Sequence, residues 1–229
     1  MKPVVNPNIA NLMLVANALG PLKDKVVFIG GATAALYVDP KLQLGARPTI
    51  DVDCVVEVSS RPDYQRLEEQ MRALGFSHDT SEDAPICRWV KSRLVVDLLP
   101  TDEKILGFSN SWYKSGVEDA EDYELPNGER ISIFKFEHFI ASKCEALLSR
   151  GMKDLVLSQD LEDILFVMDG RDSFVADLKS AAKPVQDFVS KCFKTVSEHS
   201  EFESAARGNM PRELSPERQS LLLNIIRGF

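Results

Sequence analysis

Two aspartates that alternate with apolar residues carry the strongest chemical signal in the chain. Asp51 and Asp53 lie in the largely apolar run Thr49–Val56. Successive side chains of a strand point to opposite faces, so both carboxylates are expected close together on one face. Like charges repel unless a cation lies between them, and oxygen ligands suit Mg²⁺ or Mn²⁺. The spacing predicts a metal site, and the alternative is a pair of carboxylates on a solvated sheet edge.

A third aspartate, Asp97, interrupts an otherwise apolar strand. Residues 86–100 read as two strands on either side of a short polar turn, which predicts a hairpin. A charged side chain inside a buried strand requires a partner. A neighbouring strand that carries the first two aspartates would provide one through a shared metal cluster. The alternative is that Asp97 pairs with Arg88 or Arg93.

A glycine pair, Gly30 and Gly31, ends the apolar strand 26–29 and precedes an expected helix over residues 32–38. Glycine permits a ligand to approach the backbone closely, and the N-terminus of a helix favours anions. The two peptide N–H groups are therefore candidates to bind a triphosphate. A Gly-Gly pair after a strand is by itself only a turn, and it gains meaning from the acids that follow.

The C-terminal half supplies basic residues on an expected helix over residues 136–150. Its apolar residues recur at helical spacing, and Gly151 is a stop signal. Lys143 and Arg150 are seven residues apart, so they share a face that is suited to contact the β- and γ-phosphates of a nucleotide. A solvated basic face is the alternative.

A further helix is expected to start at Ser158, which is a good N-cap. Asp160 and Asp163 are three residues apart and can share one face of this helix, whereas Glu162 fits the simpler role of an acid that stabilises the helix dipole. Asp154, just before this helix, is a weaker candidate.

Taken in order, these residues resemble the DNA polymerase β-like nucleotidyltransferase superfamily. The resemblance is carried by Gly30–Gly31, then Asp51-x-Asp53, then Asp97 in a later strand. It is closer to the AbiEii-type branch, which contains toxins of bacterial toxin–antitoxin and phage-abortive systems. Three further segments support that branch: 101–113, 143–151 and 160–164.

The resemblance implies a role for each candidate residue. Asp51 and Asp53 would hold Mg²⁺ or Mn²⁺, and Asp97 would be a further ligand or would accept a proton from the acceptor hydroxyl. Lys143 is the residue that the family singles out as catalytic and nucleotide-binding. The remaining nucleotide-binding candidates are Gly30, Gly31, Thr33, Arg150, Asp160 and Asp163.

The glycine motif departs from the family pattern. The family has Ser or Thr directly after the glycines, whereas this chain has Ala32 there and its first hydroxyl at Thr33. The first metal-binding aspartate also follows later than usual, and an inserted loop at residues 39–45 accounts for the gap. Thr33 is therefore expected to replace the missing phosphate contact.

The implied activity is transfer of a nucleoside monophosphate from an NTP, such as ATP, to an acceptor hydroxyl. An RNA or tRNA end is the expected acceptor, and the chain would act as a toxin with a cognate antitoxin. One alternative keeps the enzyme but takes a protein hydroxyl or a small molecule, such as an aminoglycoside, as acceptor. Another is a nonenzymatic binding module on the same fold.

Net charge bears on the acceptor. At −8 it disfavours nonspecific nucleic-acid binding, which depends on basic residues. Any RNA contact is expected to be local, and a solvated helix face is the alternative for the same residues. The residues in question are Lys179, Lys183, Lys191 and Lys194.

The elements that position these residues predict an α+β fold. A nucleotidyltransferase domain with a mixed β-sheet and flanking helices is expected over residues 1–134, followed by a helical bundle over 135–229. The polar segment 200–216 is expected to be a loose connection before a last helix over 217–226. No segment is long and apolar enough to span a membrane, and a cytoplasmic location is expected. The four cysteines show no metal or disulfide spacing.

Overall fold

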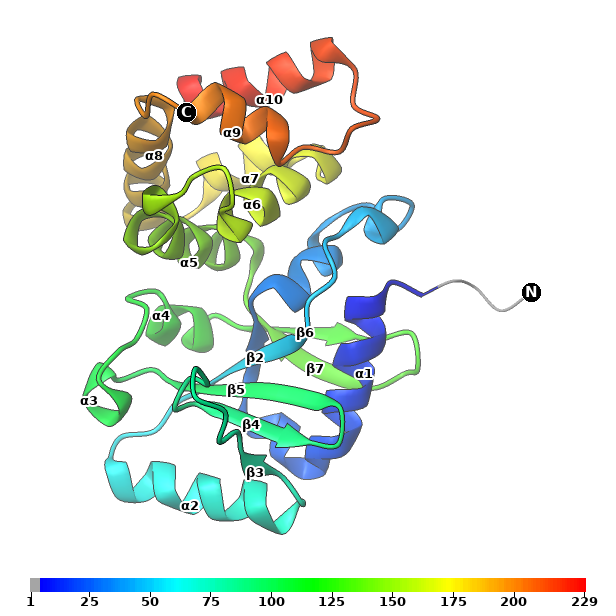
Figure 1. Ribbon diagram of the computed structural model, residues 1–229, viewed down its shortest axis with the longest axis vertical. Coiled ribbons are helices and arrows are strands. Elements are labelled where there is room, and N and C mark those ends of the chain that lie inside the picture. The colour runs from blue at the N-terminus through cyan, green and yellow to red at the C-terminus, as the bar shows by residue number, and fades with distance from the viewer. Residues whose placement is uncertain (1–4) are drawn as a thin grey trace. The chain divides into compact units, whose positions relative to one another are not determined.

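The computed structural model describes residues 5–229 and divides the chain into two compact units (Figure 1). The sheet unit comprises the chain up to Thr33 together with Pro48–Lys135, and the helical unit comprises Ala34–Arg47 together with Phe136–Phe229. Residues 1–4 of the predicted first domain lie outside the described part. The grouping of segment 34–47 with the helices was not foreseen from the sequence.

One mixed sheet of seven strands, counted over residues 5–229, organises the sheet unit in the order β3-β4-β5-β2-β1-β7-β6. β2 runs parallel to β5 and β1 parallel to β7, and the other neighbours are antiparallel. The fold is therefore α+β, as the sequence predicts. The strands are β1 Val27–Ile29, β2 Asp51–Val56, β3 Ser77–His78, β4 Arg88–Lys91, β5 Leu94–Pro100, β6 Glu121–Glu124 and β7 Arg130–Ile133.

The predicted hairpin over residues 86–100 is confirmed as β4 and β5. The two strands pair from Lys91 opposite Leu94 outward, across a turn in which Ser92 takes a left-handed backbone with φ of 54°. The second hairpin, β6 and β7, turns at Gly128 with φ of 82°, where glycine tolerates this conformation best.

Helices accompany the sheet (Figure 1). Helix α2 begins after Ser60, whose hydroxyl accepts from the peptide N–H of Asp63 at 3.3 Å. Its buried Tyr64 donates from the phenol to the Leu98 carbonyl of β5 at 2.9 Å, which ties the helix to the sheet. The helices of this unit are α1 Pro7–Leu19, α2 Arg61–Ala73, α3 Glu103–Leu106 and α4 Tyr113–Glu118.

The helical unit is built around α5, most of whose side chains are buried between α6 and α8. Ser158 caps α6 as predicted, accepting from the peptide N–H of Leu161. The tail is more ordered than expected, because Phe202, Ala205 and Ala206 give α9 an apolar face that packs on α6 and α8. The helices are α5 Phe136–Ser149, α6 Gln159–Gly170, α7 Phe174–Ser180, α8 Lys183–Ser197, α9 Phe202–Gly208 and α10 Pro216–Gly228.

Across residues 5–229, no helix combines the length and the apolar character that crossing a membrane requires.

Candidate functional site

The three predicted metal ligands lie on one face of two neighbouring strands. β2 and β5 are parallel, with Asp53 directly opposite Asp97 and Asp51 opposite Val95. The alternation of side chains places the three carboxylates on the same face. The opposite face is core, where Val52 and Cys54 of β2 are fully buried. The sheet thus gathers the acids that the sequence separates by more than forty positions.

Arg88 is the direct partner of two of these carboxylates. Its Nε donates to Asp97 Oδ1 at 2.8 Å, and its Nη2 donates to Asp97 Oδ2 at 2.7 Å and to Asp51 Oδ2 at 2.5 Å. Hydrogen bonding to Asp97 raises the pKa of Arg88 above its already high ordinary value, so the side chain remains a cation. The sequence alternative that Asp97 pairs with Arg88 is therefore present in the structure.

The register of the hairpin explains why Arg88 is placed there. β4 and β5 pair Arg88 with Asp97, and β5 and β2 pair Asp97 with Asp53. Counting outward from the two-residue turn at 92–93 pairs Arg88 with Asp97, so this contact can be predicted from the sequence. The bond from Arg88 to Asp51 cannot be predicted in this way, because it depends on which strand lies beside β5.

Gly30 lies against the carboxylate of Asp53 in the turn that follows β1. Its φ is +76°, and a Cβ added there would lie 2.9 Å from Asp53 Cγ and closer still to Asp53 Oδ2. Thr33 is fully buried, and its hydroxyl donates to the Gly30 carbonyl at 2.9 Å. Gly31 begins the short 3₁₀ helix Gly31–Tyr37, where the sequence predicts a helix over residues 32–38. The hydroxyl of Thr33 thus closes this turn.

Gly30→Ala is expected to destabilise the protein by more than backbone strain alone. A left-handed backbone costs a non-glycine residue about 1–2 kcal/mol, and the new methyl group would also displace Asp53. Gly128→Ala is the matched control, since Gly128 has φ of +82° and no atom within 4 Å of an added Cβ. Urea unfolding should show a larger loss for Gly30→Ala, and an equal loss for the two variants would contradict a close approach of Asp53.

The carboxylate cluster fits a divalent cation in donor chemistry and register. Three carboxylates on one face are the oxygen ligands that Mg²⁺ and Mn²⁺ favour. Within residues 5–229, however, the present side-chain positions bring no three acidic, histidine or cysteine groups into an arrangement that could hold an ion. Arg88 supplies the physical reason, because it engages oxygens of Asp51 and Asp97.

The four predicted site residues of the helical unit meet in one ion-pair network. The buried Lys143 Nζ contacts Asp163 Oδ2 at 2.6 Å and Asp160 Oδ1 at 3.2 Å. Arg150 Nε donates to Asp160 Oδ2 at 2.9 Å. The acids of α6 therefore face the bases of α5 directly.

Segment 34–47 adds a residue that the sequence interpretation missed. Arg47 contacts Asp163 Oδ1 through Nη2 at 3.5 Å and Glu162 Oε2 through Nε at 3.3 Å. No periodicity or motif marks Arg47, because its partners belong to α6, more than one hundred residues later in the sequence. Arg47, Lys143 and Arg150 thus face three acids in the first two turns of α6, Asp160, Glu162 and Asp163.

The network shifts two carboxyl groups in opposite directions. Burial raises the pKa of Asp160, but the charges and hydrogen bonds of Lys143 and Arg150 together outweigh it, so the pKa lies below its ordinary value. Burial raises the pKa of Glu162, although the charge of Arg47 opposes the shift. Asp160 therefore favours the folded state when it is ionised.

Asp160→Asn is expected to flatten the acid side of the stability profile. A depressed pKa contributes stability that is present above the unfolded value, near 4, and is lost as pH falls below it. At pH 7 the variant should lose about 1.5–3 kcal/mol, the range for hydrogen bonds to charged groups. Denaturant unfolding between pH 7 and 3 tests this, with Asp187→Asn as control because Asp187 forms only an exposed pair with Lys183. Parallel profiles for Asp160→Asn and the native chain would contradict it.

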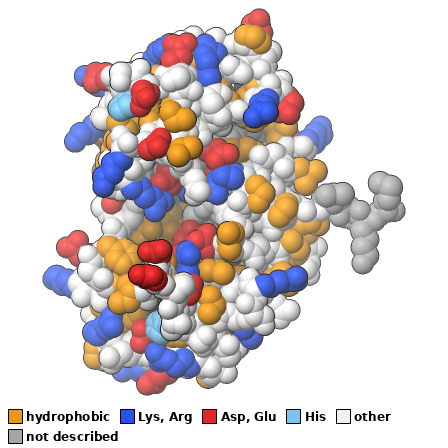
Figure 2. All heavy atoms as spheres, in the orientation of Figure 1, with side chains coloured by type: hydrophobic (Ala, Val, Ile, Leu, Met, Phe, Trp, Pro, Cys, Tyr) orange, Lys and Arg blue, Asp and Glu red, His pale blue; other side chains and the backbone are white. Residues whose placement is uncertain are grey.

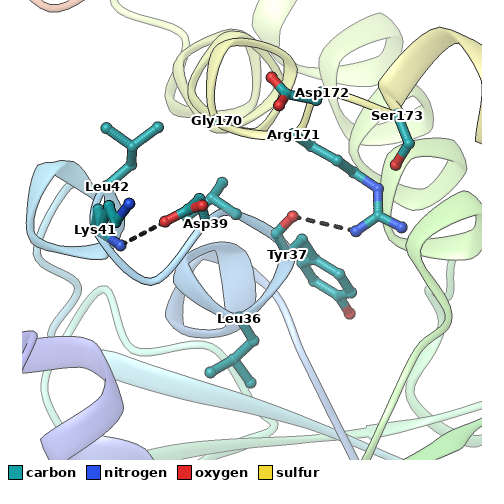
Figure 3. Close-up of a pocket in the computed structure, with 10 residues that line it drawn as sticks. Leu36, Tyr37, Asp39, Lys41, Leu42, Gly170, Arg171, Asp172 and Ser173 are labelled. Atoms are coloured by element: carbon teal, nitrogen blue, oxygen red, sulfur yellow. Dashed lines mark hydrogen bonds between the residues drawn. The ribbon is translucent and has the colours of Figure 1, made fainter.

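A pocket of about 560 Å³ lies where segment 34–47 meets the end of α6 (Figure 3). The segment is anchored there, since the Asp39 peptide N–H donates to the Gly170 carbonyl at 3.0 Å and Arg171 Nη1 donates to the Tyr37 carbonyl at 3.3 Å. None of the residues predicted to bind nucleotide lines this pocket. Of its side chains, Arg171 bonds segment 34–47 to the end of α6.

Basic and acidic side chains are interspersed over the helical unit on the face shown in Figure 2. The four lysines considered for RNA contact, on α7 and α8, are all exposed. Lys183 already pairs with Asp187 at 2.8 Å. Their positions agree equally with a solvated face and with a local contact.

Comparison with known proteins adds no relative. No protein-family model matches the chain, and a search of the curated proteins finds no match. The chain is thus defined by its architecture, an α+β protein with a seven-stranded mixed sheet over residues 5–229. The resemblance to nucleotidyltransferases rests on the motif residues of the sequence.

Proposed function

We propose that this chain is a metal-dependent nucleotidyltransferase that moves a nucleoside monophosphate from an NTP to an acceptor hydroxyl. One observation carries the proposal: Asp51, Asp53 and Asp97 share one face of two adjacent parallel strands, with Asp53 opposite Asp97. Three carboxylates in such an arrangement are costly without a cation, and Mg²⁺ or Mn²⁺ would neutralise them. Gly30 has no side chain, which lets the Asp53 carboxylate lie directly against the backbone of the turn that follows β1.

The reaction assigns each group a task. The acceptor oxygen forms a bond to the α-phosphorus, the bond from that phosphorus to the bridging oxygen breaks, and pyrophosphate leaves. Divalent ions, when bound, would supply the charge that stabilises the attacking and leaving oxygens. Asp51 and Asp53 would hold the ions. Asp97 would be a further ligand or would receive the proton of the acceptor hydroxyl.

The proposal assigns the β- and γ-phosphates to the basic residues of the helical unit. Lys143 and Arg150 carry the positive charge that such phosphates require. Asp160 and Asp163 would orient the two basic side chains, a role supported by their contacts with Lys143 at 3.2 Å and 2.6 Å. The peptide N–H groups of Gly30 and Gly31 would supply further donors, with Thr33 fixing their turn.

An RNA end, in particular that of a tRNA, is the proposed acceptor, and a toxin paired with a cognate antitoxin is the proposed biological role. Support comes from the motif resemblance, and the exposed lysines of α7 and α8 are available for a local RNA contact. The net charge of −8 favours a second candidate, in which the acceptor is a protein hydroxyl or a small molecule.

Label transfer tests the activity. The purified chain is incubated with Mg²⁺, each of four NTPs in turn and a pool of RNA and cell protein. Every NTP is supplied once with an α-label and once with a γ-label. Nucleotidyl transfer places only the α-label on the acceptor and releases labelled pyrophosphate from the γ-labelled NTP. Label on RNA supports the first acceptor, and label on protein or a small molecule supports the second. Transfer of the γ-label would indicate a phosphotransferase instead. Transfer of no label would favour a nonenzymatic binding module.

A further inference from the structure

We propose that Arg88 is an internal cation that occupies the position of a divalent ion between Asp51 and Asp97, so that a metal binds only by displacing it. This inference rests on the proposed function, because it concerns the same carboxylates. It adds a residue outside the motif that sets how tightly the site holds metal.

The geometry of one nitrogen carries the inference. Arg88 Nη2 lies 2.5 Å from Asp51 Oδ2 and 2.7 Å from Asp97 Oδ2. Carboxylate oxygens from two different strands therefore converge on one nitrogen of the cationic guanidinium. Metal–oxygen distances for Mg²⁺ are about 2.0–2.1 Å. An ion bound by the same two oxygens would lie close to Nη2, and the two cannot be present together.

The fold holds Arg88 in this position. Its backbone lies directly opposite Asp97 in the β4–β5 ladder, and Nε gives Asp97 a second bond at 2.8 Å. Two parallel bonds from a guanidinium to a carboxylate fix its orientation and are stronger than bonds between neutral groups. The arginine thus relieves repulsion among the carboxylates in the absence of metal, and the same bonds compete with any ion that arrives.

Metal affinity measured without nucleotide tests the competition. Mn²⁺ is titrated into the native chain, Arg88→Gln and Arg93→Gln, and free Mn²⁺ is followed by electron paramagnetic resonance. Arg93→Gln is the matched control, because Arg93 is exposed in the turn of the same hairpin. Arg88→Gln should bind Mn²⁺ about tenfold tighter or more, since strong charge-assisted bonds no longer oppose the ion. Arg93→Gln should bind as the native chain does.

The variant Asp53→Asn distinguishes a failure of the competition between Arg88 and metal from a failure of the proposed function. If binding depends on Asp53 but Arg88→Gln binds no tighter than the native chain, Arg88 does not compete and the inference is overturned, while the metal site stands. If Asp53→Asn leaves Mn²⁺ binding unchanged both in the native chain and in Arg88→Gln, the metal site and the proposed function fail together.

Arg88→Lys guards against a folding defect in Arg88→Gln. Lysine keeps the charge but cannot form two parallel bonds to Asp97. It should also bind Mn²⁺ more tightly than the native chain, and affinity equal to or weaker than native would overturn the inference. Thermal unfolding provides a second readout, in which saturating Mn²⁺ raises Tm more for Arg88→Lys than for the native chain.

Discussion

Asp51→Ala is expected to fold normally and to transfer nucleotide about 10²–10³-fold more slowly than the native chain. Charge stabilisation by a bound metal is worth several kcal/mol of the activation barrier, and each 1.36 kcal/mol corresponds to a factor of about ten. The fold should tolerate the change, because the side chain of Asp51 is 35% exposed and Arg88 keeps both bonds to Asp97. Loss of such a partly exposed pair costs about 0–1 kcal/mol.

The rate is measured with the α-labelled NTP that the native chain uses, and folding is measured by urea unfolding of the same preparations. Asp83→Ala is the control, since Asp83 is exposed in a loop of the same unit. It should be as active as the native chain. Native-rate transfer by Asp51→Ala would show that this carboxylate is not part of the reacting site.

Lys143→Met is expected to lower the free energy of unfolding by about 3–5 kcal/mol, the cost of removing one partner from a buried ion pair. The change leaves Asp163, which is 3% exposed, with Arg47 at 3.5 Å in place of the 2.6 Å contact from Lys143. Asp160 fares better, because Arg150 still donates to it. Lys191→Met is the control, since Lys191 is exposed on α8.

The double variant Lys143→Met/Asp163→Leu separates the structural role of Lys143 from its proposed contact with phosphate. Replacing both charges of a buried pair with apolar groups is often neutral, so part of the lost stability should return. Binding of NTP, measured by calorimetry, should not return with it. Recovery of both stability and NTP affinity would assign Lys143 to the fold alone.

Local patterns predicted the elements well, because they depend on neighbours in the sequence. The hairpin of residues 86–100 follows from apolar strands and a polar turn, and the start of α6 follows from Ser158. The prediction that residues 200–216 form a loose connection was wrong. It followed from the glycine and prolines of this segment, whereas the spacing of Phe202 and Ala205 signals α9.

The order of the strands and the contacts between remote segments were harder to predict from the sequence. Alternation predicted that Asp51 and Asp53 share a face, and only the parallel pairing of β2 with β5 brings Asp97 beside them. Strand order depends on the packing of the whole unit, which no local pattern encodes. The contacts of Arg47 with α6 have the same character, because they join two segments that are remote in the sequence.

Segment 34–47 also constrains the order of folding. The chain leaves the sheet unit after Thr33, contributes this segment to the helical unit and returns at Pro48. During synthesis the sheet unit is complete once Lys135 has emerged, but the apolar residues Ala35, Leu36 and Val38 must wait for helices that are made last. A chain cut after Lys135 would therefore separate the helices from a part of their own core. The sheet unit is thus encoded entirely within residues 1–135, whereas residues 136–229 encode the helical unit without its segment 34–47.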